Sequence, residues 1–347
     1  MPTKKHPDWP AVATALARRL NHASLHPAAM LRALAEHRRE TRRGGKPSRW
    51  AVAFSGGADS LALFLVLWAD GPGRWGRDFV VLHFNHRLRG PAADADERFC
   101  AGVCRTLGVD FVAGRWANAR KGASEAEARA ARMDFFRREM RKRKCRLLWL
   151  GHQQDDIAET MLMRLARGSG TSGLAAPRPV QEVGDGRLHL RPMLTQKKAF
   201  IVGALRKAGA IWREDATNAG DRYFRTRIRA RVLPAWTKSA GRDALAGAAL
   251  SRELLEEDAT ALDAWLDELK PLDRAGRLVL ARLHGRPQAL WRRALYRWML
   301  AQDVKTDLAR QGFAALLAAV RRGDPTRFSL GAGFAVIAGG KLLYKKG

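Results

Sequence analysis

The sequence predicts an α/β fold, in which a parallel sheet has helices on both faces and a mainly helical C-terminal domain ends in a β-hairpin. In the first half of the chain, short and nearly continuous apolar runs alternate with helical patterns, which is typical of a covered parallel sheet. In the second half, long helical patterns dominate, and the chain finishes with short apolar segments separated by glycine.

The elements of the first half follow in order. Residues 9–42 carry an Ala/Leu/Arg pattern that predicts helices broken near Pro27. Strands are expected at Trp50–Phe54, Phe79–Phe84, Val109–Val112 and Leu147–Leu150. Helices are expected at residues 58–70, 93–107, 124–144 and 154–167. Ser124 and Glu127 form a capping box, which marks the start of the third of these helices.

The second half begins with a stretch rich in Gly and Pro over residues 168–192, with a short strand expected at Leu188–Leu190. Helices are expected at residues 197–209, 222–233, 243–270, 288–301 and 305–322. The tail predicts a hairpin and a third strand, at Arg327–Leu330, Phe334–Ala338 and Lys341–Tyr344.

The charge of the chain is strongly positive, with 63 Lys and Arg against 34 Asp and Glu and a formal net charge of +29. Self-repulsion of this size is best tolerated against a polyanion, so nucleic acid is the leading class of partner, and a compositional bias toward arginine is the alternative. Cys100, Cys104 and Cys145 are too few for a disulfide framework and are expected to be buried structural thiols. No segment has the apolar length of a membrane span. We therefore expect a cytoplasmic protein.

The segment Ser55-Gly56-Gly57-Ala58-Asp59-Ser60 joins the first strand to the helix after it. This arrangement aims backbone N–H groups and the positive end of a helix at an anion, and the glycines allow a close approach. Ser55 and Ser60 add hydroxyl donors. Asp59 would repel a phosphate unless a cation lay between them, so it predicts a bound Mg²⁺. A glycine turn with a capping aspartate is the alternative.

Polar residues also follow the second and fourth strands. His83, Asn85 and His86 end the second strand, and Gly151 and His152 follow the fourth. Because ligands bind at the carboxyl ends of parallel strands, these residues are expected to line the same site. Structural hydrogen bonds are the alternative for the histidines.

The helix after the fourth strand carries Asp155, Asp156 and Glu159. Their i+3 and i+4 spacing predicts carboxylates on one helix face, where they would hold a metal or a cationic substrate. Complementing the helix dipole is the alternative for the two aspartates.

An arginine-rich segment lies between the sheet region and the C-terminal helices, with arginines at 222, 225, 227 and 229 beside Tyr223 and Phe224. Planar guanidinium groups beside aromatic rings predict a surface that contacts phosphate or AMP, and a solvated basic face is the alternative.

Five ordered motifs between about residues 50 and 235 resemble the bacterial tRNA(Ile)-lysidine synthetase family of the PP-loop pyrophosphatase superfamily. They are S-G-G-A-D-S, N-H-R-L-R after the second strand, Glu125–Arg129 with Arg132, G-H-Q-Q-D-D-I-A-E-T running into R-L-A-R-G-S-G-T-S-G-L, and E-D-A-T-N through R-T-R-I-R. The chain departs from the family at Arg87, Ile157 and Thr226, where Gly, Gln and Asn are usual. The region after residue 240 resembles the tRNA-recognition part of the family weakly.

The helical pattern before the first strand predicts an N-terminal helical extension (residues 1–47). The resemblance implies a PP-loop ATP pyrophosphatase catalytic domain (48–236) and a C-terminal tRNA-recognition domain (237–347). It implies ligation of L-lysine to C2 of the wobble cytidine of tRNA(Ile) with a CAU anticodon. The reaction would pass through an adenylated tRNA and convert ATP to AMP and pyrophosphate. Another PP-loop tRNA-modifying enzyme, such as a tRNA thiolase, is the alternative, but the spacing of Cys100 and Cys104 does not supply the cysteine set that a thiolase needs. The oligomeric state, a homodimer included, stays open.

The implied site falls into groups of residues. Those expected to be catalytic are Asp59, Asp155, Asp156, Glu159, Arg129 and Arg225. Those expected to bind ATP are Ser55, Gly56, Gly57, Ala58, Asp59, Ser60, His83, Asn85, His86, Gly151 and His152. Asp59 is the expected Mg²⁺ ligand. The acidic face would bind the lysine ammonium and accept its proton, and Arg129, Arg132 and Arg225 would contact phosphate or the adenylated intermediate. The target base is expected to be splayed from the anticodon loop.

Overall fold

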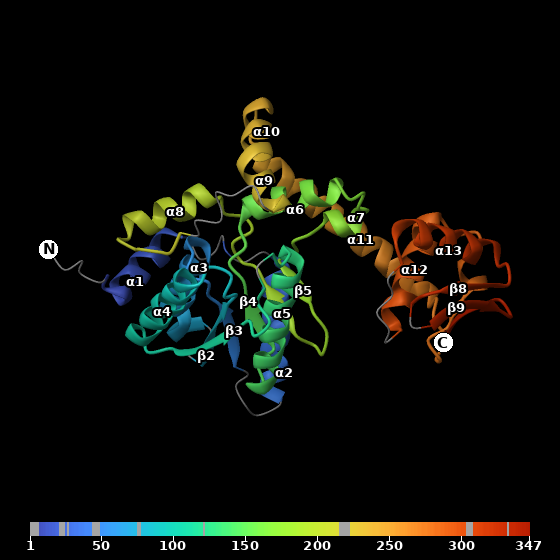
Figure 1. The fold of residues 1–347 in the computed structure, drawn as a ribbon, viewed down its shortest axis with the longest axis horizontal. Coiled ribbons are helices and arrows are strands. Elements are labelled where there is room, and N and C mark those ends of the chain that lie inside the picture. The colour runs from blue at the N-terminus through green and yellow to red at the C-terminus, as the bar shows by residue number, and fades with distance from the viewer. Residues whose placement is uncertain are drawn as a thin grey trace. The chain divides into compact units, whose positions relative to one another are not determined.

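The computed structural model describes residues 7–20, 25, 28–43, 49–74, 78–120, 122–214, 223–302, 308–331 and 333–347. Its contacts divide the chain into two compact units, Met1–Leu254 and Leu255–Gly347 (Figure 1). The division falls inside the long helix α11 (Ala244–Leu269). The domain boundary that the sequence places after residue 236 stays a prediction.

The first unit is built on a six-stranded sheet with the order β3-β2-β1-β4-β6-β5. The strands are β1 Trp50–Ala53, β2 Phe79–Asn85, β3 Asp110–Arg115, β4 Leu147–Trp149, β5 Val180–Glu182 and β6 Leu188–Leu190. All neighbouring pairs are parallel except β5 and β6, which are antiparallel. The chain adds β2 and β3 on one side of β1 and then β4 on the other. The carboxyl ends of β1 and β4 therefore form a topological switch point, where folds of this class bind ligands.

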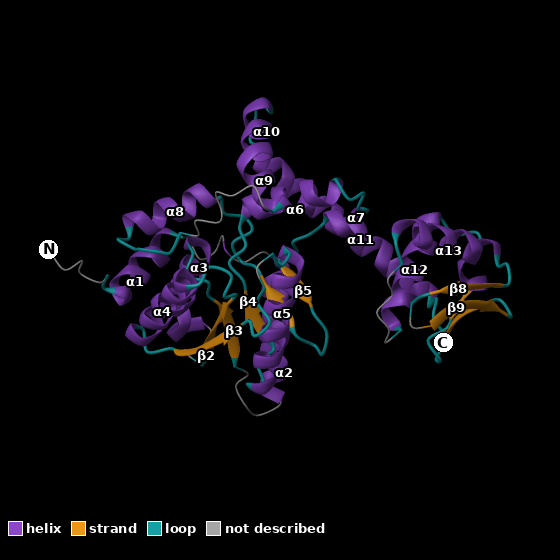
Figure 2. Cartoon of the chain, viewed as in Figure 1, coloured by secondary structure: helices purple, strands orange, loops and turns teal. Residues whose placement is uncertain are grey.

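Helices cover both faces of this sheet (Figure 2). The helices of the first unit are α1 Trp9–Arg19, α2 Ala28–Arg43, α3 Ala58–Arg74, α4 Pro91–Thr106, α5 Glu125–Lys142, α6 Gln154–Leu165, α7 Thr171–Leu174, α8 Lys198–Lys207, α9 Phe224–Arg227 and α10 Leu233–Ser239, with a π-helix η3 at Ile228–Val232. Ser124 caps α5 through the predicted capping box, in which Ser124 Oγ accepts from the backbone N–H of Glu127 and the Glu127 side chain accepts in return.

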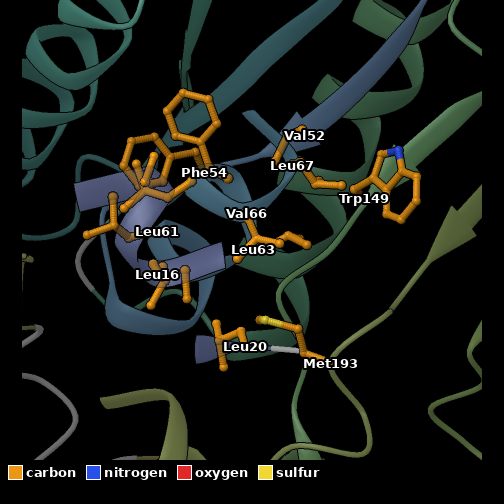
Figure 3. Close-up of a cluster of buried hydrophobic side chains, with 14 of the residues drawn as sticks. Leu16, Leu20, Val52, Phe54, Leu61, Leu63, Val66, Leu67, Trp149 and Met193 are labelled. Atoms are coloured by element: carbon orange, nitrogen blue, oxygen red, sulfur yellow. The ribbon is translucent and has the colours of Figure 1, made fainter. Parts of the chain in front are cut away.

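Alternate side chains of each strand enter two different cores, as the period of a strand requires. Trp50 and Val52 pack with α1, α3 and α4 on one face, and Ala51 and Leu148 pack with α5 on the other. Figure 3 shows the first of these cores, with Leu16 of α1 among the side chains of α3 and the sheet. The N-terminal helices therefore belong to the core of the first unit, and the predicted α/β sheet with helices on both faces is confirmed.

The second unit holds a four-stranded antiparallel sheet in the order β7-β10-β9-β8. Its elements are β7 Leu278–Val279, a 3-10 helix η4 at Leu280–Leu283, α12 Gln288–Ala301, α13 Arg310–Arg322, β8 Thr326–Ser329, β9 Gly333–Ala338 and β10 Lys341–Lys346. Trp291, Trp298 and Leu316 of the two helices are buried against Ile337 and Leu342 of the sheet. The predicted terminal hairpin and third strand are confirmed, and β7 is added to them.

None of the described helices is long and apolar enough to cross a membrane.

Candidate active site

The loop from Ser55 to Ser60 leaves β1 and becomes the first turn of α3. Hydrogen bonds of its two serine hydroxyl groups join the ends of the loop. Ser55 Oγ and Ser60 Oγ are 2.9 Å apart, and Ser60 Oγ donates to the carbonyl oxygen of Gly57 at 3.0 Å. Gly56 has a φ of +89°, which strongly favours glycine. The result is a tight turn with the amino terminus of α3 directly behind it, as an anion site requires.

Gly151, the second residue after β4, lies against this loop. A Cβ on Gly151 would lie 2.9 Å from the carbonyl oxygen of Asp59 and 3.0 Å from the Cα of Ser60. Both are backbone atoms and cannot rotate away. Gly151 therefore permits the carboxyl end of β4 to touch the phosphate loop, which brings the predicted residues of the two segments together.

Asp59 occupies a partly buried position in this contact. Its Oδ2 is 3.4 Å from Lys198 Nζ, and its Oδ1 is buried without a hydrogen-bond partner. Burial raises the pKa of Asp59, with Lys198 opposing the shift and Asp156 adding to it. No group of three or more His, Cys, Asp or Glu side chains within the described residues would hold a metal by itself. Mg²⁺ commonly takes one or two carboxylates together with substrate phosphates and water, so the buried Oδ1 of Asp59 fits such an ion.

The acidic side chains of α6 are held by arginines from α9 and η3. Glu159 is 1% exposed and accepts from Arg225 Nε at 2.7 Å, Arg229 Nε at 2.5 Å and Arg229 Nη2 at 2.9 Å. Asp156 Oδ1 accepts from Arg225 Nη2 at 2.5 Å, and Asp156 Oδ2 accepts from the backbone N–H of Gln153 at 2.9 Å. All four carboxylate oxygens of the pair are used within the chain.

Asp155 points to a different partner. Its Oδ2 accepts from the backbone N–H of Lys198 at 3.1 Å and thereby caps α8 from outside. Asp156 and Glu159 therefore share the arginines of α9 and η3, whereas Asp155 is bonded to the start of α8. Binding of a metal or a cationic substrate by these carboxylates stays a prediction. Consecutive helix residues are about 100° apart around the axis, so Asp155 and Asp156 can meet different partners although each lies within about one turn of Glu159.

A cluster of arginines surrounds His152, and we call Arg129, Arg132, Arg191 and Arg225 the arginine cluster. Burial first, and then these four cations, hold the pKa of His152 well below its usual range, so the imidazole is neutral. Burial and the neighbouring arginines lower the pKa of Arg132 to about 10, and burial and Arg129 lower that of Arg191 to about 10. Enclosed cations that repel one another favour an anionic ligand.

Sequence reasoning did not find Arg191. It directly follows β6, and its position at the carboxyl end of a parallel strand would have marked it as a candidate site residue. The structure adds it to Arg129, Arg132 and Arg225, which the sequence predicted.

The polar residues that end β2 hold the framework of the site. His83 Nδ1 lies 2.9 Å from the carbonyl oxygen of Phe54, and burial lowers the pKa of this histidine. Asn85 Nδ2 donates to Asp94 Oδ1 at 3.0 Å and to Glu97 Oε2 at 2.8 Å. The ring of His86 packs edge-on against Phe84 and Trp116. Contact of these three residues with a nucleotide stays a prediction. The bonds of His83 and Asn85 tie β2 to Phe54, the residue before the phosphate loop, and to α4.

A second link to the loop comes from residues that the sequence did not single out. Arg213 donates its backbone N–H to the carbonyl oxygen of Gly56 at 2.9 Å, and its Nε donates to Asp96 Oδ1 at 2.6 Å. Arg89 Nη2 donates to the other oxygen of Asp96 at 2.6 Å. Asp96 and Arg213 are far apart in sequence, so no local pattern announced the pair. Arg222 and the stretch 215–222 lie outside the described residues.

Known proteins resemble this chain in sequence. A family model described as PP-loop domain matches residues 29–236. A tRNA(Ile)-lysidine synthase from Solibacter usitatus is 41% identical over 187 residues, covering 54% of this chain and 40% of that protein. Another from Geobacter sulfurreducens is 36% identical over 276 residues, covering 76% of this chain and 57% of that protein. The solved structure of the U34-tRNA thiolase NcsA from Methanococcus maripaludis aligns with a TM-score of 0.49 and 13% identity over 71% of this chain and 78% of that chain.

The chain spans about half the length of the curated relatives it matches. The family model covers more than half of the chain itself, and the loop and sheet order described above lie within the matched region. The chain belongs to the PP-loop domain family.

Proposed function

We propose that the protein ligates L-lysine to C2 of the wobble cytidine of tRNA(Ile) with a CAU anticodon, using ATP and releasing AMP and pyrophosphate. The observation that carries this proposal is the contact of Gly151 with the phosphate loop at the carboxyl ends of β1 and β4, with His152 and its arginine cluster directly after Gly151. The similarity to curated tRNA(Ile)-lysidine synthases across this region supports the choice of substrates. The net charge of +29 suits a tRNA partner.

The first half of the proposed reaction is adenylation of the base. The C2 oxygen of cytosine is a poor leaving group and must be activated before it can be displaced. It attacks the α-phosphorus of ATP, the bond from that phosphorus to the bridging oxygen breaks, and pyrophosphate leaves with the electron pair. The backbone N–H groups of Gly56 and Gly57 and the start of α3 would face the phosphates. Arg129, Arg132 and Arg225 would stabilise the charge that develops on the α-phosphate. Mg²⁺, held by Asp59, would neutralise the polyphosphate.

The second half is attack by the ε-amine of lysine on C2, with AMP as the leaving group. An ammonium with a reference pKa of about 10.4 must first lose a proton. Asp156 and Glu159 are bound to Arg225 and Arg229, so these two carboxylates would receive the lysine only after the arginines turn to the adenylated base. Asp155 is the acidic residue of α6 that no arginine holds, and we propose it as the proton acceptor.

A thiolase is less well supported. Cys100, Cys104 and Cys145 are all buried, and burial raises the pKa of each thiol, that of Cys145 to about 11. A thiolate is the reactive form, so these cysteines are poorly placed to transfer sulfur.

One incubation tests the proposal: the protein, ATP, radiolabelled L-lysine and a tRNA(Ile) transcript with a CAU anticodon. We expect label in the RNA that depends on ATP, and none in a transcript with a CAC anticodon. Absence of lysine-dependent label at protein concentrations that bind the tRNA would contradict the function.

Asp59→Asn tests the role of the loop carboxylate. We expect this variant to lose ATP–pyrophosphate chemistry while its affinity for the tRNA stays near that of the wild type, because the change removes one charge at the proposed metal position. Equal loss of both properties would indicate a folding role instead.

A further inference from the structure

Lys198, the first residue of α8, lies beside Asp59 and has no part in the function proposed above. Its Nζ is 3.4 Å from Asp59 Oδ2, which is longer than a close charge-assisted hydrogen bond. The lysine side chain is 40% exposed, and that of Asp59 is 22% exposed. The ammonium makes no other hydrogen bond within the part of the chain that the structure describes. Two of its three donors are therefore available to a ligand.

The amino termini of three helices meet at this pair. α3 begins with the phosphate loop, α6 begins at Gln154 and α8 begins at Lys198. The starts of α6 and α8 are held together, because Asp155 Oδ2 caps Lys198 and the backbone N–H of Gln154 donates to the carbonyl oxygen of Gln196 at 2.8 Å. Each helix presents its positive end, so the place favours an anion with several charges.

The other cation near Asp59 is already committed. Lys198 and Arg229 are the cations that lower the pKa of Asp59, and Arg229 makes a bidentate contact with Glu159. Lys198 has only the long contact with Asp59. Within the described residues, Lys198 is thus a cation beside the loop that can turn to a phosphate without breaking a short ion pair.

We propose that Lys198 binds the β and γ phosphates of ATP and then the pyrophosphate product. In the free protein its ammonium balances the charge of Asp59, and on nucleotide binding it moves to the phosphates, which would leave Asp59 available to hold Mg²⁺. When the bond between the α-phosphorus and the bridging oxygen breaks, the electron pair stays on pyrophosphate, and Lys198 stabilises that charge. This inference rests on the proposed function and adds a residue to it.

Lys198→Met is the direct test, and Lys197→Met is its matched control. The two lysines are neighbours at the start of α8, but Lys197 pairs with Asp243 instead of Asp59. Calorimetric titration with ATP, pyrophosphate and AMP, each with and without Mg²⁺, separates the phosphates that are bound. We expect Lys198→Met to weaken ATP and pyrophosphate binding by about 10- to 100-fold, as for loss of a charged hydrogen bond, and to change AMP binding by less than about 2-fold. Lys197→Met should change none of the three.

Lys198→Arg keeps the charge and should retain ATP affinity to within about 5-fold, since arginine also binds phosphate. Unchanged pyrophosphate binding in Lys198→Met, or equal weakening of AMP and ATP, would overturn the assignment. A wild-type protein that binds neither ATP nor pyrophosphate would instead contradict the proposed function. If the wild type and Lys198→Met bind ATP and pyrophosphate with equal affinity, the role of Lys198 is contradicted and the proposed function is not.

Discussion

Replacing Gly151 with alanine tests whether the close contact between β4 and the phosphate loop organises the site. The new Cβ would lie 2.9 Å from the carbonyl oxygen of Asp59, 3.0 Å from its carbonyl carbon and 3.0 Å from the Cα of Ser60. Carbon atoms in contact prefer a separation of about 3.5 to 4.0 Å, so the loop must move by about 0.5 Å. Overpacking of this kind costs about 1 to 3 kcal/mol.

The displaced backbone atoms belong to Asp59, which is proposed to hold Mg²⁺, and to Ser60. We therefore expect a clear loss of enzymatic activity even where most of the protein stays folded. A misplacement of about 1 Å at a reacting centre can cost about 100-fold, and half that distance suggests a loss of about 10-fold or more in ATP-dependent labelling of the tRNA. Urea unfolding measures the stability, and titration with ATP measures the site.

Gly102→Ala is the control for this prediction. Gly102 lies in α4, a Cβ added to it would meet no atom within 4 Å, and an alanine in a helix interior is favoured over glycine by about 1 kcal/mol. This variant should therefore be unchanged or slightly more stable, with ordinary ATP binding. Wild-type stability and ATP affinity in Gly151→Ala would refute the reasoning, because the contact would then be too loose to position Asp59.

Three further predictions concern the surroundings of the site. Glu159→Gln leaves Arg225 and Arg229 without a full counter-charge and should destabilise the first unit by about 3 kcal/mol in urea unfolding, whereas Asp134→Asn, in an exposed pair with Arg137, should cost less than about 1 kcal/mol. Equal effects would show that the buried network contributes little. Burial first, and then Arg191, lower the pKa of His189 to about 4, whereas the pKa of a histidine in the unfolded chain is about 6.5. The folded state therefore binds fewer protons than the unfolded state between these two pH values. The free energy of unfolding is at its full value above about pH 6.5 and falls by about 3 kcal/mol in total as the pH is lowered toward 4. His189→Gln should flatten the pH dependence of the unfolding free energy in that window, and an unchanged slope would contradict the assignment. Arg213→Met removes a bond to Asp96 and should raise the KM for ATP by about 10-fold, with partial recovery in Arg213→Lys; an unchanged KM would show that Gly56 is held without it.

Much of the fold follows from local patterns. The predicted helix at residues 288–301 is α12, and the predicted strand Leu188–Leu190 is β6. Such elements are readable because their period and their capping residues lie within a few positions of one another. β5 (Val180–Glu182) and β7 (Leu278–Val279) were missed. β5 contains a single apolar residue and β7 only two residues, so neither shows an apolar run, and both gain their stability from the strand beside them.

The residues of the site were likewise partly readable from the sequence, whereas their partners were not. The loop Ser55–Ser60 was readable because a phosphate loop is a contiguous string, placed by the strand before it and the helix after it. The acidic residues of α6 were also singled out, but the arginines that bind Asp156 and Glu159 in the structure could not be read from the local sequence. Their partners Arg225 and Arg229 come from a segment more than sixty residues away, as the separations of 66 to 70 positions between the bonded residues show.

By itself, therefore, the sequence determined the parallel sheet, the phosphate loop that ends its first strand, and the residues that make a polyanion and a nucleotide the expected ligands. Only the tertiary structure decided how those residues are paired: Arg213 with Asp96, 117 positions apart, and Lys198 with Asp59, 139 positions apart. The reason is physical. A helix, a strand or a loop is selected by neighbours along the chain, whereas an ion pair is selected by which surfaces pack together, and a charge at a given position is compatible with many partners until the fold brings one of them within reach.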